Sequence, residues 1–109
     1  MSVPPPIATG AFVLVSPDGR RTPITVKIGC PCAVEANRAR CPVGIEGLDG
    51  AYPDMEGVDT LQALCLAVGL VRTRLLARLE QGDTLLYADD DDDETGIPVD
   101  LDAHFAVPR

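Results

Sequence analysis

The stretch of sequence that decides the fold is DTLQALCLAVGLVRTRLLARLEQG, residues 59–82. It opens with a capping box, in which the Asp59 carboxylate accepts from an early helical amide and Gln62 reaches back to the chain before the helix. It closes at Gly82, the residue type that most readily adopts the left-handed conformation that ends a helix. The spacing predicts one helix from Asp59 to about Gln81, roughly 33 Å long.

One face of this helix is expected to be buried. At 100° per residue, its large apolar side chains fall within one stripe. The stripe consists of Leu61, Leu64, Cys65, Val68, Leu75, Leu76 and Leu79. Arg72 projects into it and must meet a carboxylate or extend to water. Leu66 and Leu70 lie on the far side and predict a second contact. That contact is a partner groove, a dimer seam, or cover by the N-terminal segment or residues 97–107.

Upstream of the helix, the sequence predicts an antiparallel sheet. Residues 11–15 are β-branched and apolar, and residues 20–29 alternate between apolar and polar after the turn at 16–19. Residues 41–48 alternate again, and residues 84–88 are a short further candidate. Such alternation is typical of half-buried strands. The fold class is therefore α+β, a three- to four-stranded antiparallel sheet with one long helix packed on one face, in the order β-β-β-α-β.

The same patterns divide the chain into three parts. Residues 1–9 are a flexible Pro-rich lead-in, residues 10–88 form a single α+β domain, and residues 89–109 form an acidic loop and C-terminal tail. Within the domain, residues 30–38 and 49–57 lack a clear period and are expected to be loops.

Charge is concentrated at the end of the chain. Of 17 acidic and 9 basic residues, residues 83–109 hold nine acids and a single base, so residues 1–82 hold eight of each. A local field of this sign disfavours nucleic acid. The longest nearly unbroken apolar stretch, 63–71, is far short of the twenty or so residues of a membrane span, and the N-terminus does not look like a leader. We expect a cytoplasmic protein with reduced cysteines and no membrane contact.

Two motifs carry a family resemblance. They are Gly57 followed by Val58-Asp-Thr-Leu-Gln-Ala-Leu64, and Cys41-Pro-Val-Gly-Ile-Glu-Gly47 upstream. Together they resemble a small bacterial family catalogued as a domain of unknown function, whose helix opens G-V-D-[ST]-L-Q-A-L. Thr60 replaces the usual Ser, and the resemblance extends over roughly residues 20–100. It implies the fold and no particular activity.

The cysteines suggest a metal or redox site as one alternative. Cys30, Cys32 and Cys41 could supply three thiolates to zinc, with Cys65 or His104 as the fourth ligand. The spacing lacks the second C-x₂₋₄-C pair of structural zinc sites, so structural or incidental thiols are favoured, and a labile Cys30/Cys32 pair stays open. No cofactor and no bound metal are predicted.

Two further patterns, a calcium-loop spacing and a single histidine, have simpler interpretations. Asp91 to Asp102 overlays the spacing of an EF-hand calcium loop, but Pro98 takes an aliphatic position and no helix enters the loop. A solvated acidic loop is favoured instead. His104 is the only histidine and belongs to no catalytic motif, so we do not expect an enzyme.

The leading hypothesis is a non-enzymatic protein-binding module. Its specific form is an immunity- or antitoxin-like neutraliser that presents acidic residues to a basic toxin domain. The expected contact residues are Asp89, Asp90, Asp91, Asp92, Asp93, Glu94, Leu66 and Leu70. The acidic run could equally keep the protein soluble or fold back on the helix arginines. The alternatives are a cysteine-based zinc or redox-responsive module, a small subunit of a larger bacterial assembly, or a homodimer.

Overall fold

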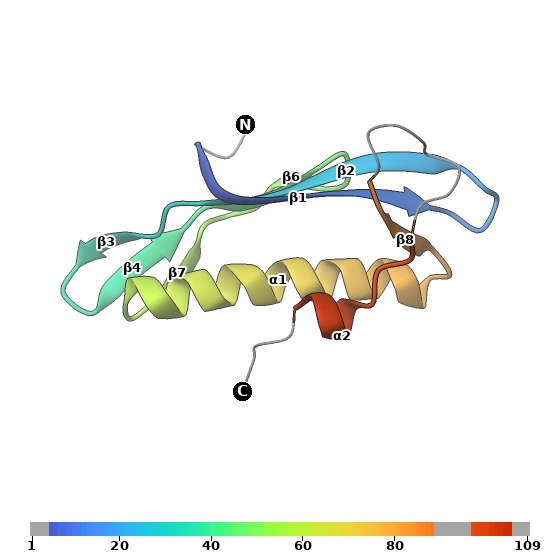
Figure 1. Cartoon of the computed structure of the whole chain (residues 1–109). Coiled ribbons are helices and arrows are strands. Elements are labelled where there is room, and N and C mark those ends of the chain that lie inside the picture. The colour runs from blue at the N-terminus through green and yellow to red at the C-terminus, as the bar shows by residue number, and fades with distance from the viewer. Residues whose placement is uncertain (1–4, 89–96, 106–109) are drawn as a thin grey trace.

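The structure is a computed structural model that describes residues 5–88 and 97–105 (Figure 1). The strands are β1 (Pro6–Val15), β2 (Arg21–Gly29), β3 (Cys32–Glu35), β4 (Arg38–Cys41), β5 (Val43–Glu46), β6 (Gly50–Ala51), β7 (Met55–Gly57) and β8 (Thr84–Tyr87). The helices are α1 (Thr60–Glu80) and α2 (Leu101–His104). Because β1 begins at Pro6, part of the expected lead-in belongs to the sheet.

The strands form two antiparallel sheets. One has five strands in the order β6-β5-β2-β1-β8, and the other has three in the order β3-β4-β7. The prediction of a single three- to four-stranded sheet with one helix is therefore wrong. The segments expected as loops, 30–38 and 49–57, contribute strands of two to four residues. Strands this short show no readable apolar period, and exposed ion pairs from Arg38 to Glu35 (3.0 Å) and Glu56 (2.7 Å) link the smaller sheet.

The two sheets are joined end to end, because β2 leads into β3 and β4 leads into β5. In the larger sheet Ile28 of β2 lies opposite Val43 of β5. In the smaller one Cys32 of β3 lies opposite Arg40 of β4. The register therefore shifts by one residue between Gly29 and Cys32, the segment that contains Pro31, and this shift has the form of a β-bulge. In Figure 1, β3 and β4 accordingly extend outward from the end of the larger sheet.

Helix α1 lies along both sheets (Figure 1). The predicted capping box is confirmed at its start. The Asp59 carboxylate accepts from the Gln62 amide at 2.8 Å, and the Gln62 side chain accepts from the Val58 amide at 2.7 Å. The helix ends at Glu80, and Gly82 has the left-handed φ of +98° that its position predicted. By length and composition alone α1 could also cross a membrane, a test that the core helix of a soluble protein passes too.

The buried face of α1 differs from the predicted stripe. Its fully buried residues are spaced by four and are Ala63, Ala67, Val71 and Leu75. Leu61, Cys65 and Leu76 are exposed, so their predicted burial is wrong. The reason is close approach, since small alanines bring the helix axis near the strands. At Gly57 on β7, an added Cβ would lie only 2.7 Å from the Ala63 amide nitrogen.

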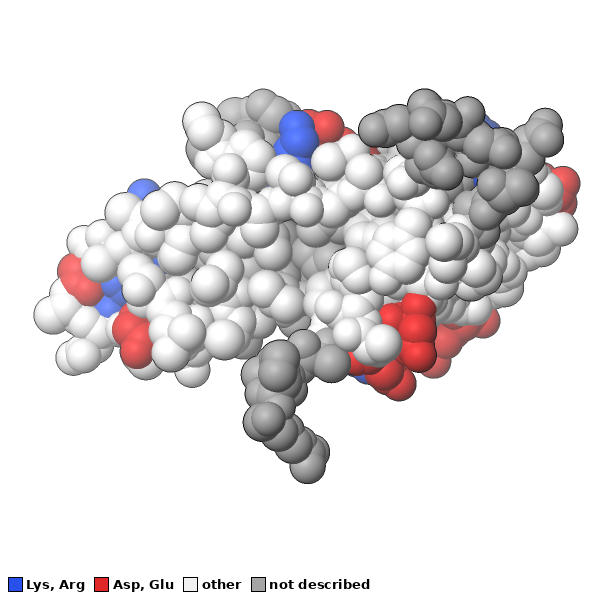
Figure 2. Space-filling model, in the orientation of Figure 1, with Lys and Arg blue, Asp and Glu red and all other residues white. Residues whose placement is uncertain are grey.

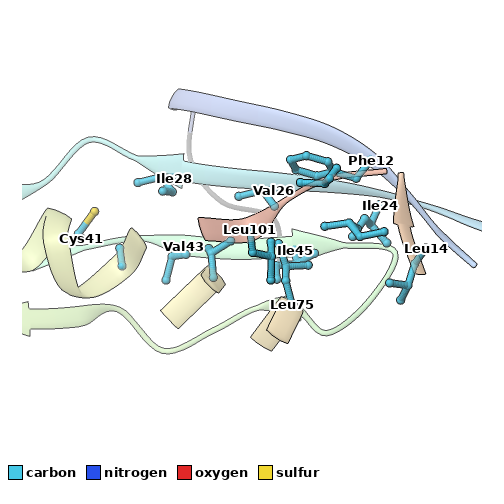
Figure 3. Close-up of a cluster of buried hydrophobic side chains, with 14 of the residues drawn as sticks. Phe12, Leu14, Ile24, Val26, Ile28, Cys41, Val43, Ile45, Leu75 and Leu101 are labelled. Carbon is cyan, nitrogen blue, oxygen red and sulfur yellow. The ribbon is translucent and has the colours of Figure 1, made fainter. Parts of the chain in front are cut away.

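The core lies between α1 and the inner faces of the two sheets, most of it under the larger one, and Cys41 extends it under the smaller one (Figure 3). Its buried side chains include Phe12, Leu14, Ile24, Val26, Ile28, Val43, Ile45, Leu75, Leu85 and Leu101. Leu101 comes from α2, and the neighbouring Asp102 pairs with Arg72 of α1 at 2.5 Å. Arg72 thus meets a carboxylate, one of the two outcomes expected for it, and its side chain remains partly exposed.

Candidate functional site

The outward surface of α1 is the strongest candidate for an interaction site. Four large apolar residues are exposed on or beside it, namely Val58 (58%), Leu61 (68%), Leu66 (40%) and Leu76 (37%). We call these four residues, together with the exposed Cys65, the outer α1 face. The helix carries no charged residue before Arg72. Several large apolar side chains exposed along one helix are a feature of protein interaction sites.

The two leucines that were predicted to contact a partner lie in different surroundings in the structure. Leu66 lies on the outer α1 face, whereas Leu70 is half-buried and packs against the core. Leu61 and Leu76, which the sequence placed in the buried stripe, take the place of Leu70 at the surface. The sequence signal that could have shown the orientation of the helix is the pair of alanines at 63 and 67, because small residues mark the side of a helix that lies closest to a sheet.

The acidic contact residues Asp89, Asp90, Asp91, Asp92, Asp93 and Glu94 lie outside the described residues. The acids around them have internal roles. Asp83, which is buried, pairs with Arg78 at 2.7 Å, and Asp102 pairs with Arg72. The Asp100 carboxylate accepts from the Asp102 amide at 3.0 Å at the start of α2. Acids close to the run in sequence therefore hold the C-terminal segment to α1.

A third helix arginine belongs to a polar cluster at the turn between β5 and β6. The Tyr52 hydroxyl donates to Asp49 Oδ2 at 2.5 Å, and Arg74 Nε donates to the same oxygen at 2.8 Å. Burial, together with the bond to Asp49, raises the pKa of Tyr52 to about 12. The Tyr52 hydrogen bond, and after it Arg74, lower the pKa of Asp49. A tyrosine that holds its proton this firmly anchors the turn to α1 and is unsuited to proton transfer.

A small apolar hollow of about 120 Å³ lies beside the first half of β1. Its lining is Ala8, Thr9, Gly10, Phe12, Val26, Ile28, His104 and Phe105. Along β1, β8 pairs with Phe12–Val15 and the Ala88 amide donates to the Ala11 carbonyl, so among the described residues no strand pairs with Pro6–Gly10 on that side. His104 Nδ1 lies 2.9 Å from the Tyr87 hydroxyl, and its ring packs edge-on against Phe12. Figure 2 shows that the face in view is mostly uncharged, with a cluster of acidic residues at the place that α2 has in Figure 1.

A larger and more polar hollow of about 260 Å³ lies near the turn between β1 and β2. Asp83 and Arg78 on its wall pair with each other. The Asp18 carboxylate, also on the wall, accepts from the Ser16 hydroxyl and from the Arg20 amide. These groups already satisfy one another, so the hollow offers a ligand little unpaired chemistry.

The predicted metal ligands are not gathered into a site. Cys41 is buried and donates to the Gly29 carbonyl at 3.4 Å, while Cys30, Cys32 and Cys65 are exposed. Within residues 5–88 and 97–105, no three His, Cys, Asp or Glu side chains stand close enough to hold a metal ion. Most of the calcium-loop pattern, including Asp91, lies outside the described part of the chain.

The comparison with known proteins gives a family and no activity. A family model described as a domain of unknown function, DUF6968, matches residues 12–99. No curated protein and no solved structure matches the chain. The match covers every described strand and α1 apart from the first residues of β1.

Proposed function

We propose that this chain, which belongs to the DUF6968 family of unknown function, is a non-enzymatic protein-binding module that contacts its partner through the outer α1 face. The observation that carries the proposal is the 68% exposure of Leu61 on the first half of α1, which has no charged residue before Arg72. Covering such a side chain contributes roughly 1.5–3 kcal/mol, so the exposed leucines supply a large part of an interface.

The finer form of the proposal is an immunity- or antitoxin-like neutraliser in the bacterial cytoplasm. Six consecutive acidic residues, 89–94, supply the charge for a basic partner. The three arginines on the second half of α1 already pair with other carboxylates, those of Asp49, Asp83 and Asp102. Because these arginines are already paired, a partner protein is favoured as the source of the positive charge that the acidic run would attract. Electrostatic attraction of this kind speeds association and weakens with added salt.

Site-specific crosslinking tests the proposal. A photo-reactive benzophenone amino acid replaces Leu61 in one variant and Pro23 in a matched control, in cells that naturally produce the protein. Pro23 is exposed on β2, within the sheet that α1 covers from the other side. We expect one discrete protein adduct at position 61, none at 23, and loss of the adduct when Leu66→Asp is added.

A second arm addresses the charge. Replacing residues 89–94 by alternating Ser and Gly should lower the adduct yield and remove its sensitivity to salt. An equal yield from both positions, or no adduct at 61, would contradict the binding module. An adduct that is insensitive to salt and to the Ser/Gly replacement would refute the neutraliser while leaving the binding face in place. An adduct of twice the chain's own mass would identify a second copy as the partner.

A further inference from the structure

Cys30 and Cys41 lie near each other where the two sheets meet, since the Cys41 thiol contacts the carbonyl of Gly29, the residue before Cys30. The pairing of β2 with β5 continues one step past the strands, because the Gly29 amide donates to the Pro42 carbonyl at 2.9 Å. Continued by one residue, this register places Cys30 opposite Cys41 in a non-hydrogen-bonded pair. Directly opposed residues in such a pair have Cα atoms about 4.5 Å apart. This separation lies within the range of about 4.4–6.8 Å that a disulfide needs.

The two thiols differ in a way that suits a sequential reaction. Cys30 is exposed, whereas Cys41 is buried and donates to the carbonyl of Gly29, the residue just before Cys30. Burial raises the pKa of Cys41, and the charges of Asp54 and Cys30 add to the shift. An oxidant in solution therefore reaches Cys30 first, and Cys41 is held beside it.

Cys32 is not equivalent to Cys41 as a partner for Cys30. The bulge at Pro31 separates Cys30 from Cys32, and Cys32 pairs in register with Arg40 on the next strand. The Cys32 thiol lies 3.5 Å from the Ala33 carbonyl, along its own strand. The topology thus favours Cys41 on the facing strand, and not Cys32, as the partner of Cys30.

We propose that Cys30 and Cys41 form a reversible disulfide driven by hydrogen peroxide, with Cys30 as the oxidation site and Cys41 as the resolving thiol. The Cys30 thiolate attacks one peroxide oxygen, the O–O bond breaks, and the departing hydroxide takes a proton to become water. This leaves a sulfenic acid on Cys30. The Cys41 sulfur then attacks the Cys30 sulfur, the S–O bond breaks, and hydroxide leaves with the Cys41 proton as a second water. Two thiols are oxidised and one peroxide is reduced.

The bond would fix the joint between the two sheets beneath the first half of α1. Cys41 contributes to the same core as Ala63 and Ala67 of that helix. A dithiol reductant restores the two thiols by exchange. The inference rests on the cysteines alone and is independent of the proposed partner.

Peptide mapping of the full chain tests the pairing. The protein carries Cys65→Ser, is treated with hydrogen peroxide, has its remaining thiols alkylated, and is digested with trypsin without reduction. Trypsin cleaves after Arg38 and Arg40, between the two cysteines. We expect peptide 28–38 joined to peptide 41–72. The bond should persist in the matched control Cys32→Ser, disappear in Cys30→Ser, and be reversed by a dithiol.

Several results would overturn the assignment. These are a disulfide confined within peptide 28–38, a joined pair that survives Cys30→Ser, disulfide-linked dimers only, or four unreacted thiols in the natural chain. A second measurement uses Cys41→Ala and a dimedone probe for sulfenic acid. It should label Cys30 several-fold more than in the natural chain, because the resolving thiol is gone. If Cys41→Ala does not fold, the Cys30→Ser and Cys32→Ser comparison still decides the outcome.

Discussion

Replacing Leu75 and Leu61 by alanine, one at a time, separates the observed packing of α1 from the packing that apolar periodicity predicts. Both leucines fall in the predicted stripe, yet Leu75 is 0% exposed and Leu61 is 68% exposed. Truncating a fully buried leucine removes its transfer free energy and leaves a cavity, which costs about 2–5 kcal/mol. Truncating Leu61 removes little buried surface, so its cost should stay within about 0.5 kcal/mol.

Urea unfolding followed by far-ultraviolet circular dichroism measures both effects. With a urea dependence of about 1.5 kcal/mol per molar, a loss of about 3 kcal/mol lowers the Leu75→Ala midpoint by roughly 2 M. The Leu61→Ala midpoint should move by less than about 0.4 M on the same scale. Equal destabilisation by the two changes would show that Leu61 is buried and would refute the orientation of α1 described above.

Three further changes test particular contacts. Because the pKa of Tyr52 is raised to about 12 in the folded protein, its contribution to stability is complete below pH 10 and is lost between pH 10 and about 12. Alkaline unfolding should therefore flatten in Tyr52→Phe and stay unchanged in the control Tyr87→Phe. Gly57→Ala should destabilise the fold by about 1–3 kcal/mol, since its Cβ would meet the Ala63 amide at 2.7 Å, and an unchanged thermal midpoint would contradict this contact. Gly69→Ala, with nothing within 4 Å, should raise the thermal midpoint by an amount equivalent to about 0.5–1 kcal/mol, and a lower midpoint would mean that the site is covered.

Helix α1 could be predicted almost to the residue because its end signals are local. Asp59 and Gln62 form the bonds that their spacing implies, and Gly82 takes the expected conformation. The smaller sheet could not be predicted, because its strands are very short, and β7 pairs with a hairpin, β3 and β4, that lies well before it in the sequence. The ion pair between Arg38 and Glu56 joins residues eighteen positions apart, and no period in the sequence reports it.

The orientation of α1 was predicted wrongly because an apolar pattern is recognised mainly by its large side chains. Leucine dominates such a pattern, but close packing on a sheet favours small residues at the nearest points, here Ala63 and Ala67. The exposed leucines were consequently placed in the core, and Leu70 was placed at the surface. An uncharged run ahead of Arg72 was the available hint that this helix carries apolar side chains on its exposed face as well as on its buried face.

The bulge at Pro31 has a mechanical consequence for the whole molecule. Proline lacks an amide hydrogen, and Pro42 lies opposite Gly29, two residues before Pro31, so both strands lose a hydrogen-bond donor where the sheets meet. The two blocks of strands are thus free to bend relative to each other unless α1, which rests on both, keeps them aligned. Loosening the first turns of that helix would release the smaller block while leaving the larger one folded.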